Sequence, residues 1–144
     1  KQDNNIKLLK TIPGIGEVFA PIIALEINDI NRFCDEKKLW SYVGLVPRTY
    51  ASGGRVYYGR LIKFCNKWLR WAFIEAAHSS IRSSVYFGRN YMRMKHQRGS
   101  ATAIIDTARK LAKVVYYVLK EKLAYKESQP TSKIFNPQLD SGQG

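Results

Sequence analysis

Apolar residues recur at helical spacing through most of the chain, which predicts a mainly α-helical protein. The first such stretch, at 6–9, runs into a turn at 11–16. Pro13 blocks continuation of a helix in that turn, so we expect the first helix to be short. A second helix is expected over 17–27, and a turn over 28–31 should follow it.

A Pro-Gly-Ile-Gly turn at 13–16 between two helices is the pattern of a helix-hairpin-helix, which we expect within residues 1–30. In that motif the amides of Gly14 and Gly16, at the start of the second helix, would bind a backbone phosphate without reading the base sequence. A purely structural corner between two helices fits the same residues equally well.

The middle of the chain combines a short helix with a stretch of different character. The helix is expected to begin after Asp35 or Cys34 as its N-cap, to run through Tyr42 and to stop at Gly44. Beyond it, strand-favouring residues flank a Ser-Gly-Gly turn at 52–54. This pattern predicts a β-hairpin or an irregular loop that carries the serine.

Three longer elements are expected after that loop. A helix from about 66 to 83 should bury a stripe that includes Trp68, and we expect His78 on this helix to be packed or capping rather than a general base. A helix or an ordered basic arm is expected over 85–98, and the clearest helix over 101–124. The buried stripe of this last helix is expected to consist of Ile104, Ile105, Ala108, Leu111, Ala112, Val115, Leu119 and Leu123.

Composition adds a domain plan to this list of helices. The chain has 144 residues, of which 45% are apolar, and this is enough to build one domain with a core. We expect a helical domain over 31–125. From 126 to 144 the residues shift to Ser, Gln, Pro, Asn and Gly, which predicts a poorly ordered tail.

Charge narrows the class of partner. The formal net charge is +13, and residues 37–105 hold 13 basic residues and one acid, which leaves +12 in the middle of the chain. Such a concentration of positive charge predicts a polyanion as partner: DNA, RNA or an acidic membrane surface. No apolar run approaches the length that spans a bilayer, so we expect no membrane partner.

Cysteine usage and the acidic residues give no metal site. Cys34 and Cys65 lack a paired spacing and do not combine with the two histidines into a zinc-ligand pattern. Glu26 and Asp29 could face each other as a metal pair, but a helix end and a turn residue explain them better. Two lone cysteines suit a reducing, cytoplasmic setting. The absence of an initial Met suggests a fragment of a longer protein.

Ser52 is the candidate nucleophile, because it is a small hydroxyl in a glycine-rich turn among cations, with no carboxylate from 46 to 70. Phosphodiester chemistry needs such surroundings. A surface hairpin that touches nucleic acid and does no chemistry is the alternative, and spacing alone favours it. The residues expected to contact nucleic acid are Gly14, Gly16, Arg48, Gly53, Gly54, Arg55, Arg60, Lys63, Lys67, Arg70, Arg89 and Arg93.

Two groups of these cations follow a helical pattern. Lys63, Lys67 and Arg70 recur at intervals of four and three, so they should share a face. Arg89 and Arg93 lie among aromatic residues in 85–98, a mixture that suits nucleic acid. A solvated helix face would have the same composition, so both interpretations of this segment stay open.

Several short motifs occur together in a fixed order between about residues 8 and 125. They are Thr-Ile-Pro-Gly-Ile-Gly at 11–16, Glu-Ile-Asn-Asp-Ile at 26–30, Tyr-Val-Gly-Leu-Val-Pro at 42–47, Ser-Gly-Gly at 52–54, Gly-Arg-Leu-Ile-Lys at 59–63, Asn-Lys-Trp-Leu-Arg-Trp at 66–71 and Ala-Arg-Lys-Leu-Ala at 108–112. Each alone is weak. Together they resemble the C-terminal transposase domain of the IS110 insertion-sequence transposases, a group also named for IS116 and IS902.

The resemblance implies a role and partners that composition does not. It implies that Ser52 is the nucleophile in DNA strand cleavage and transfer. It also implies an upstream RuvC-like domain, outside this chain, whose acidic residues bind a divalent metal such as Mg²⁺. A structured guide RNA and a homo-oligomer that pairs two DNA molecules are further implications. The expected location is the nucleoid in the cytoplasm of a bacterium or archaeon, and the fragment alone should be inactive.

The competing hypothesis is a non-catalytic helix-hairpin-helix module that binds DNA or RNA. A tyrosine recombinase is disfavoured, because we find no matching Arg-His-Arg set beside the tyrosines. A self-contained metal nuclease is disfavoured as well, because the basic centre of the chain lacks carboxylates.

Overall fold

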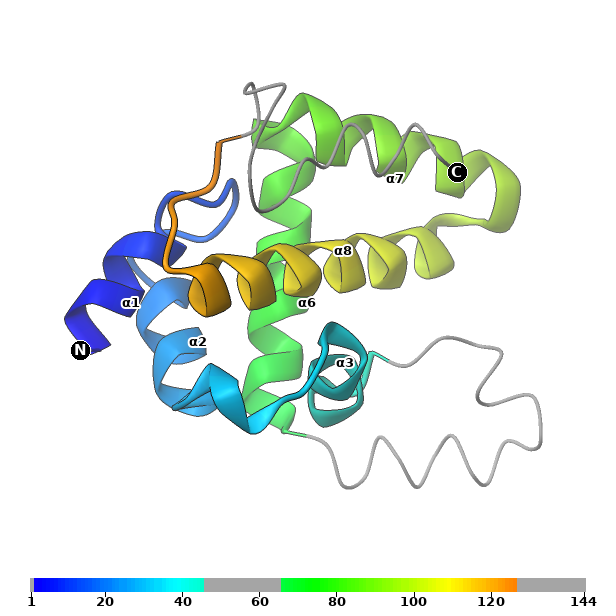
Figure 1. Cartoon of the computed structure of the whole chain (residues 1–144). Helices are drawn as coiled ribbons and strands as arrows, with labels where there is room; N and C mark the ends of the chain where they lie inside the picture. Colours follow the sequence, from blue (N-terminus) through cyan, green and yellow to red (C-terminus); the bar gives the residue numbers. More distant parts are fainter. Residues whose placement is uncertain (1, 46–65, 127–144) are drawn as a thin grey trace.

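The computed structural model describes residues 2–45 and 66–126, and every regular element within them is helical (Figure 1). The elements are α1 (Gln2–Leu9), α2 (Phe19–Ile27), the short 3₁₀ helix η1 (Ile30–Arg32), α3 (Glu36–Val43), α6 (Lys67–Ser83), α7 (Val85–Arg98) and α8 (Ser100–Glu121). A mainly α-helical chain is therefore confirmed for the described part. The expected serine-bearing hairpin or loop, and the expected tail from 127 onwards, lie outside it.

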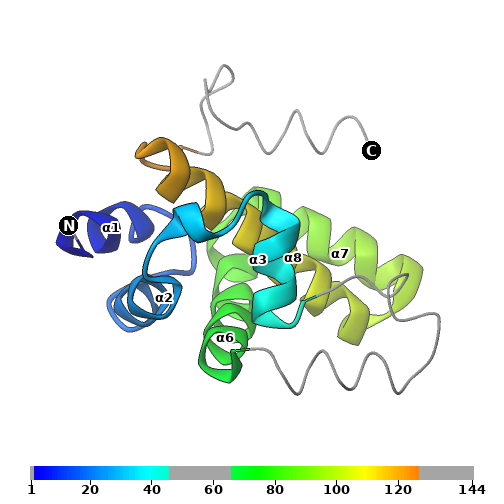
Figure 2. The ribbon, with the colours of Figure 1, turned by 60° about the horizontal axis from the view of Figure 1, so that its bottom comes forward.

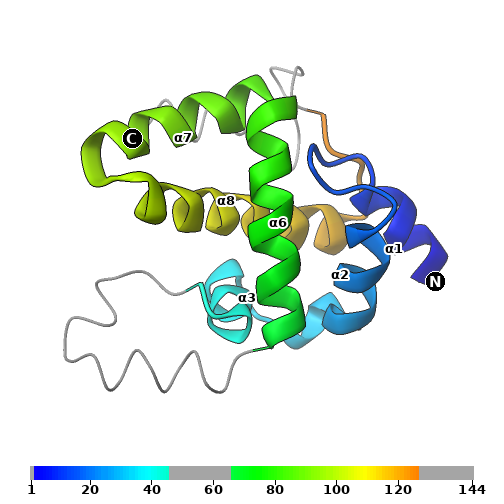
Figure 3. The ribbon, with the colours of Figure 1, turned by 180° about the vertical axis from the view of Figure 1, so that it is seen from behind.

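α6 and α8 cross in the middle of the molecule, and the other helices pack around this crossing (Figures 1 and 3). α7 folds back along α8, so the two form a helical hairpin. α2 lies beside α6, and α3 lies against α8 close to the first turn of α6 (Figure 2). The first turn of α6 is therefore surrounded by α2 and α3.

One hydrophobic core unites these helices. Its largest buried side chains include Leu9 of α1, Ile23 of α2, Phe73 of α6, Phe87 of α7 and Leu111 of α8. The segment expected to form a separate motif at the N-terminus thus shares the core of the rest. The domain boundaries themselves stay a prediction.

Polar side chains begin several helices as the sequence predicts. The Asp35 carboxylate accepts a hydrogen bond from the Lys38 amide (2.9 Å), and Gly44, with φ 88°, ends α3 in the left-handed region. The Asn66 side chain accepts from the Leu69 amide (3.0 Å) at the start of α6. Both ends of α3 and the start of α6 are therefore confirmed.

Some boundaries and faces differ from expectation. α2 begins at Phe19 rather than at 17, and α8 ends at Glu121 because Lys122 turns into the left-handed region (φ 60°). Leu123 thus falls outside the helix and is exposed, so its assignment to the buried stripe is wrong. Segment 85–98, expected to be a helix or an ordered basic arm, is a regular helix.

Two assignments on α6 are also wrong. Trp68 is 67% exposed and does not belong to the buried stripe, because it lies about 100° around the helix from the line of Leu69, Ala76 and Phe73. His78 is exposed rather than packed, and the helix end is capped by the Ser84 amide. None of the described helices is both long and apolar enough to cross a membrane.

Candidate nucleic-acid interface

Asn66, the first described residue after 46–65, forms hydrogen bonds with residues of α2, α3 and α6. Its backbone amide donates to the Tyr42 carbonyl (2.8 Å) near the end of α3. Its side-chain amide donates to Glu26 Oε1 on α2 (2.8 Å) and to the Tyr42 hydroxyl (3.2 Å). We call Glu26, Tyr42 and Asn66 the Asn66 junction. Tyr42, near the end of α3, and Asn66, the first described residue after 46–65, are therefore hydrogen bonded to each other.

Hydrogen bonds also hold the end of α3, which precedes the undescribed residues 46–65. The Gly44 amide donates to the carbonyls of Trp40 and Ser41, and the Leu45 amide donates to Trp40 as well (2.8 Å). Arg70 Nε donates to the Gly44 carbonyl at 3.4 Å, a long hydrogen bond. Leu45 itself is fully buried, so the last described residue before 46 belongs to the core.

Most of the predicted catalytic and binding residues fall within 46–65. Ser52 and its neighbours Arg48, Gly53, Gly54, Arg55, Arg60 and Lys63 all lie outside the described residues. The role of Ser52 and the contacts of these cations stay predictions.

The structure does describe the two cations in the first turn of α6. Lys67 is exposed, whereas Arg70 is half-buried and turned towards Gly44. The acid on α6, Glu75, is exposed and lies more than one turn beyond them. This turn therefore presents positive charge next to the Asn66 junction.

Arg89 and Arg93 lie on α7, at the other end of α6. A helix of the length of α6 rises about 25 Å, so it separates these arginines from Lys67 and Arg70 (Figure 1). Arg89 and Arg93 are exposed, and α7 contains no acidic residue. The four predicted binding cations that the structure describes thus form two groups, one at the start of α6 and one on α7, and the fold does not bring these groups together.

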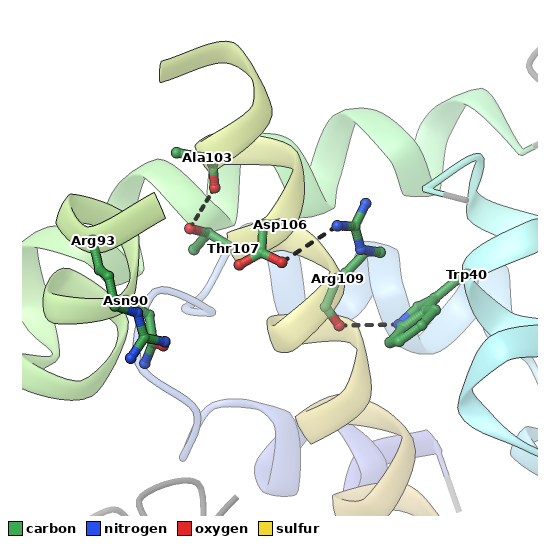
Figure 4. Close-up of polar contacts among 7 residues, drawn as sticks. All are labelled: Trp40, Asn90, Arg93, Ala103, Asp106, Thr107 and Arg109. Atoms are coloured by element: carbon green, nitrogen blue, oxygen red, sulfur yellow. Dashed lines mark hydrogen bonds and ion pairs between the residues drawn. The ribbon is translucent and has the colours of Figure 1, made fainter. Parts of the chain in front are cut away.

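Arg93 is held in place by a buried partner. Its guanidinium donates to Asn90 Oδ1 at 2.6 Å, and Asn90 is 5% exposed (Figure 4). The Asn90 amide in turn donates to the Tyr86 carbonyl (2.9 Å). Asn90 therefore orients a cation that would otherwise move freely in water.

The two glycines of the predicted phosphate-binding turn have different surroundings. Gly14 has φ 91°, and a Cβ atom added there would lie 2.6 Å from the Ala76 carbonyl oxygen and 2.7 Å from the Ser80 nitrogen. This turn therefore packs directly on the backbone of α6, as the structural corner requires. Gly16 is exposed and has open space around it. Phosphate binding by either glycine stays a prediction.

The acidic residues near this site have structural partners. Glu26 accepts from Asn66, and Asp29 Oδ1 accepts from the Asn31 amide (3.0 Å) as the cap of η1. The interpretation of the two as a helix end and a turn residue is confirmed. In the part of the chain that the structure describes, no three His, Cys, Asp or Glu side chains come together as a metal site.

Sequence reasoning missed two features of this region. It treated Asn66 only as a helix start, although Asn is a favoured N-cap whose amide group can still donate elsewhere. It also placed Trp68 inside, although the helical wheel separates Trp68 and Trp71 from the apolar line of α6. Neither signal is decisive by itself, because the partner of an amide group and the burial of a position at the edge of the apolar line depend on which helices pack nearby.

Comparison with known proteins identifies relatives over most of the chain. The model of the "Transposase IS116/IS110/IS902 family" matches residues 6–93. The chain is 25% identical over 128 residues to a "Probable family 20 transposase" of Pseudomonas aeruginosa, which covers 86% of this chain and 38% of the relative. It is 25% identical over 130 residues to the "Transposase for insertion sequence element IS1111A" of Coxiella burnetii, covering 88% and 36%.

A third relative carries a different description. The chain is 35% identical over 123 residues to the "Pilin gene-inverting protein" of Moraxella bovis, covering 83% of this chain and 38% of the relative. This chain thus spans less than two-fifths of the length of each of these three relatives. The chain belongs to the IS116/IS110/IS902 family of transposases.

Proposed function

We propose that this chain is the part of a longer transposase that binds nucleic acid and supplies Ser52 as the nucleophile for DNA strand cleavage and transfer. The observation that carries the proposal is the Asn66 junction. Its hydrogen bonds bring residues 42 and 66 together, beside the cationic first turn of α6. The chain on either side of Ser52 is thus anchored to the helical scaffold, at Tyr42 before it and at Asn66 after it.

The proposed step is a transesterification. The Ser52 hydroxyl oxygen bonds to the phosphorus of a DNA phosphodiester while the bond from that phosphorus to one deoxyribose oxygen breaks. The hydroxyl proton passes to a base, and the departing sugar oxygen gains a proton. Attack by a second DNA end reverses the step, so the phosphoserine link conserves the energy needed for rejoining.

Charge stabilisation falls to the arginines nearest Ser52 in sequence. Arg48, Arg55 or Arg60 would stabilise the negative charge that develops on the phosphoryl oxygens. The base, and any divalent metal, belong in this proposal to the part of the longer protein that this chain does not span.

The proposed partners follow from the same charge distribution. DNA is the substrate, and a structured guide RNA and a second copy of the full-length protein are further proposed partners. Two separate cationic groups, on α6 and on α7, support contacts with extended polyanions. Binding through phosphate contacts should weaken steeply as salt rises.

A covalent adduct tests the proposal. The full-length parent, its guide RNA and a nicked DNA that traps cleavage are mixed, and a protein–DNA species that survives denaturation is sought. We expect it in wild type and in the control Ser41→Ala, an exposed serine of α3, but not in Ser52→Ala. An adduct of equal yield in Ser52→Ala would place the nucleophile elsewhere.

The alternative function is a non-catalytic module that binds DNA or RNA. The packing of the Gly14 turn on α6 favours this alternative. That packing leaves Gly16 exposed at the surface, just before the N-terminus of α2. In this case no variant gives an adduct, Ser52→Ala binds like wild type, and Gly16→Glu weakens binding by charge repulsion.

A further inference from the structure

Two tryptophans of α6 lie at the surface of the protein. Trp68 is 67% exposed and Trp71 is 46% exposed. Trp68 has no hydrogen bond and no ring contact with the residues that the structure describes. The third tryptophan, Trp40, behaves as structural tryptophans usually do: it is half-buried, and its indole N–H donates to the Arg109 carbonyl at 3.0 Å (Figure 4). Two solvent-exposed tryptophan side chains on one helix indicate an interaction surface.

Positive charge accompanies the two indoles. Lys67 is exposed beside Trp68, and the same face of α6 continues to His78 and Arg82, which are exposed as well. The exposed acid Glu75 also lies on this face, so the cations outnumber the acid there by two to one. Figure 3 shows α6 in front of the other helices when the molecule is seen from behind. Aromatic rings among cations suit a nucleic-acid strand whose bases are unpaired, because stacking needs a free base face and the phosphates need cations.

α2 supports Trp71 from one side. The Phe19 ring meets the Trp71 ring edge-on, with centroids 5.5 Å apart and planes at 67°. This contact restricts the indole, so less rotational freedom would be lost when a base stacks on it.

A protein partner is the competing occupant of this face. Leu25 of α2 (70%) and Val18 just before α2 (62%) are exposed, and the one charged residue of α2, Glu26, is hydrogen bonded to Asn66. However, the indoles lie on α6, where cations outnumber the acid, rather than on α2, whose charged residue is an acid. A second copy of a chain with a net charge of +13 would be repelled by Lys67 and Arg82. Charge complementarity therefore favours a polyanion.

We propose that Trp68 and Trp71 stack on unpaired bases of a nucleic-acid strand while Lys67 contacts its phosphates. This inference rests on nucleic-acid binding by the chain as part of its proposed function, and it specifies the form of the ligand. A duplex keeps its base faces inside the stack, so only a single-stranded or unpaired segment can use this face.

The experiment compares single-stranded and duplex DNA with the full chain. The probes are a fluorescently labelled oligothymidylate of about 12 nucleotides and a labelled duplex of the same length. Trp68→Ala should weaken binding of the single strand roughly 5- to 100-fold and leave duplex binding within about twofold. Trp68→Phe should retain most of the affinity because it keeps a ring. Leu25→Ala, equally exposed but on α2, is the matched control and should bind both probes like wild type.

Folding and self-association are measured on the same samples. If Trp68→Ala fails to fold, Trp68→Leu replaces it, because leucine keeps apolar bulk without a stacking ring. Trp68→Leu should then show the same loss of single-strand binding relative to Trp68→Phe. An equal loss for both probes would overturn the inference, as would unchanged single-strand binding. Loss of self-association in Trp68→Ala, by light scattering, with intact single-strand binding would identify a protein-docking face instead.

The failure of this inference can be told apart from that of the proposed function. Wild type that binds the duplex but not the oligothymidylate would overturn only the unpaired-base inference. Wild type that binds neither probe, at low salt, would overturn nucleic-acid binding by this chain and the inference with it.

Discussion

The side-chain amide of Asn66 donates a hydrogen bond to the Glu26 carboxylate at 2.8 Å, across 40 positions of sequence. The same side chain caps α6 through the Leu69 amide. One residue therefore sets where α6 starts and ties that start to α2. Both partners are half-buried, so the bond is partly shielded from water.

Replacement of Asn66 should destabilise the fold. Asn66→Ala removes the cap of α6 and leaves Glu26 without this donor, for a loss of about 1–3 kcal/mol in the free energy of unfolding. Urea denaturation followed by circular dichroism measures the loss. Asn4→Ala, an exposed asparagine of α1, is the control. A loss for Asn66→Ala no larger than for Asn4→Ala would contradict a stabilising junction.

The two glycines of the α1–α2 turn should respond differently to alanine. Gly14→Ala forces a side chain into the left-handed region and to within 2.6 Å of the Ala76 carbonyl oxygen. It should cost about 2 kcal/mol or more. Gly16→Ala meets open space and should change stability by about 1 kcal/mol at most. Thermal melting of the two variants side by side distinguishes them, and similar values would argue against the packing of this turn on α6.

Alkaline pH should weaken the fold through Tyr116. Burial raises the pKa of the Tyr116 phenol above its usual range, and the nearby Asp35, Cys34 and Glu36 raise it further. Its hydroxyl donates to the Phe33 carbonyl at 3.1 Å. Because the folded-state pKa is the higher one, this contribution is complete below about pH 10 and is lost as pH rises through the folded-state pKa. Tyr116→Phe should reduce the fall in stability above pH 10, measured by urea denaturation. A fall of the same size in both proteins would exclude Tyr116 as its cause.

Lys67 should contribute a phosphate contact if the chain binds nucleic acid as proposed. Lys67→Ala should lower the slope of log affinity against log salt by about 1 and should weaken binding similarly for all sequences. Lys10, whose ammonium pairs with Glu17 on the surface (3.1 Å), provides the control Lys10→Ala. Anisotropy titrations over a range of salt give both slopes, and identical slopes for the two variants would remove Lys67 from the interface.

Local chemistry made several elements predictable. Asp35 and Gly44 mark the two ends of α3, and the apolar spacing of 104–119 defines the buried side of α8. Such signals depend only on neighbours within one or two turns, so they survive without knowledge of the fold. The same holds for the motifs that indicate the family and for the charge that indicates a polyanion.

The candidate site was less predictable from the sequence. Its cations are visible in the sequence, but the separation of Lys67 and Arg70 from Arg89 and Arg93 by the length of α6 appears only in the fold. The exposure of Trp68 and the position of Gly14 against α6 were missed for the same reason. Whether a side chain is buried depends on which helices pack over it, and that is not a property of its own segment.

The sequence by itself determined the helical class, the ends of α3 and the start of α6, the basic character of the centre and the family. Only the tertiary structure decided that Asn66 joins Glu26 and Tyr42, that the Gly14 turn rests on α6 and that Trp68 faces outwards. The division has one physical cause. Helix propensity and capping act between near neighbours, whereas packing and burial arise between residues that are tens of positions apart and meet only when the chain has folded.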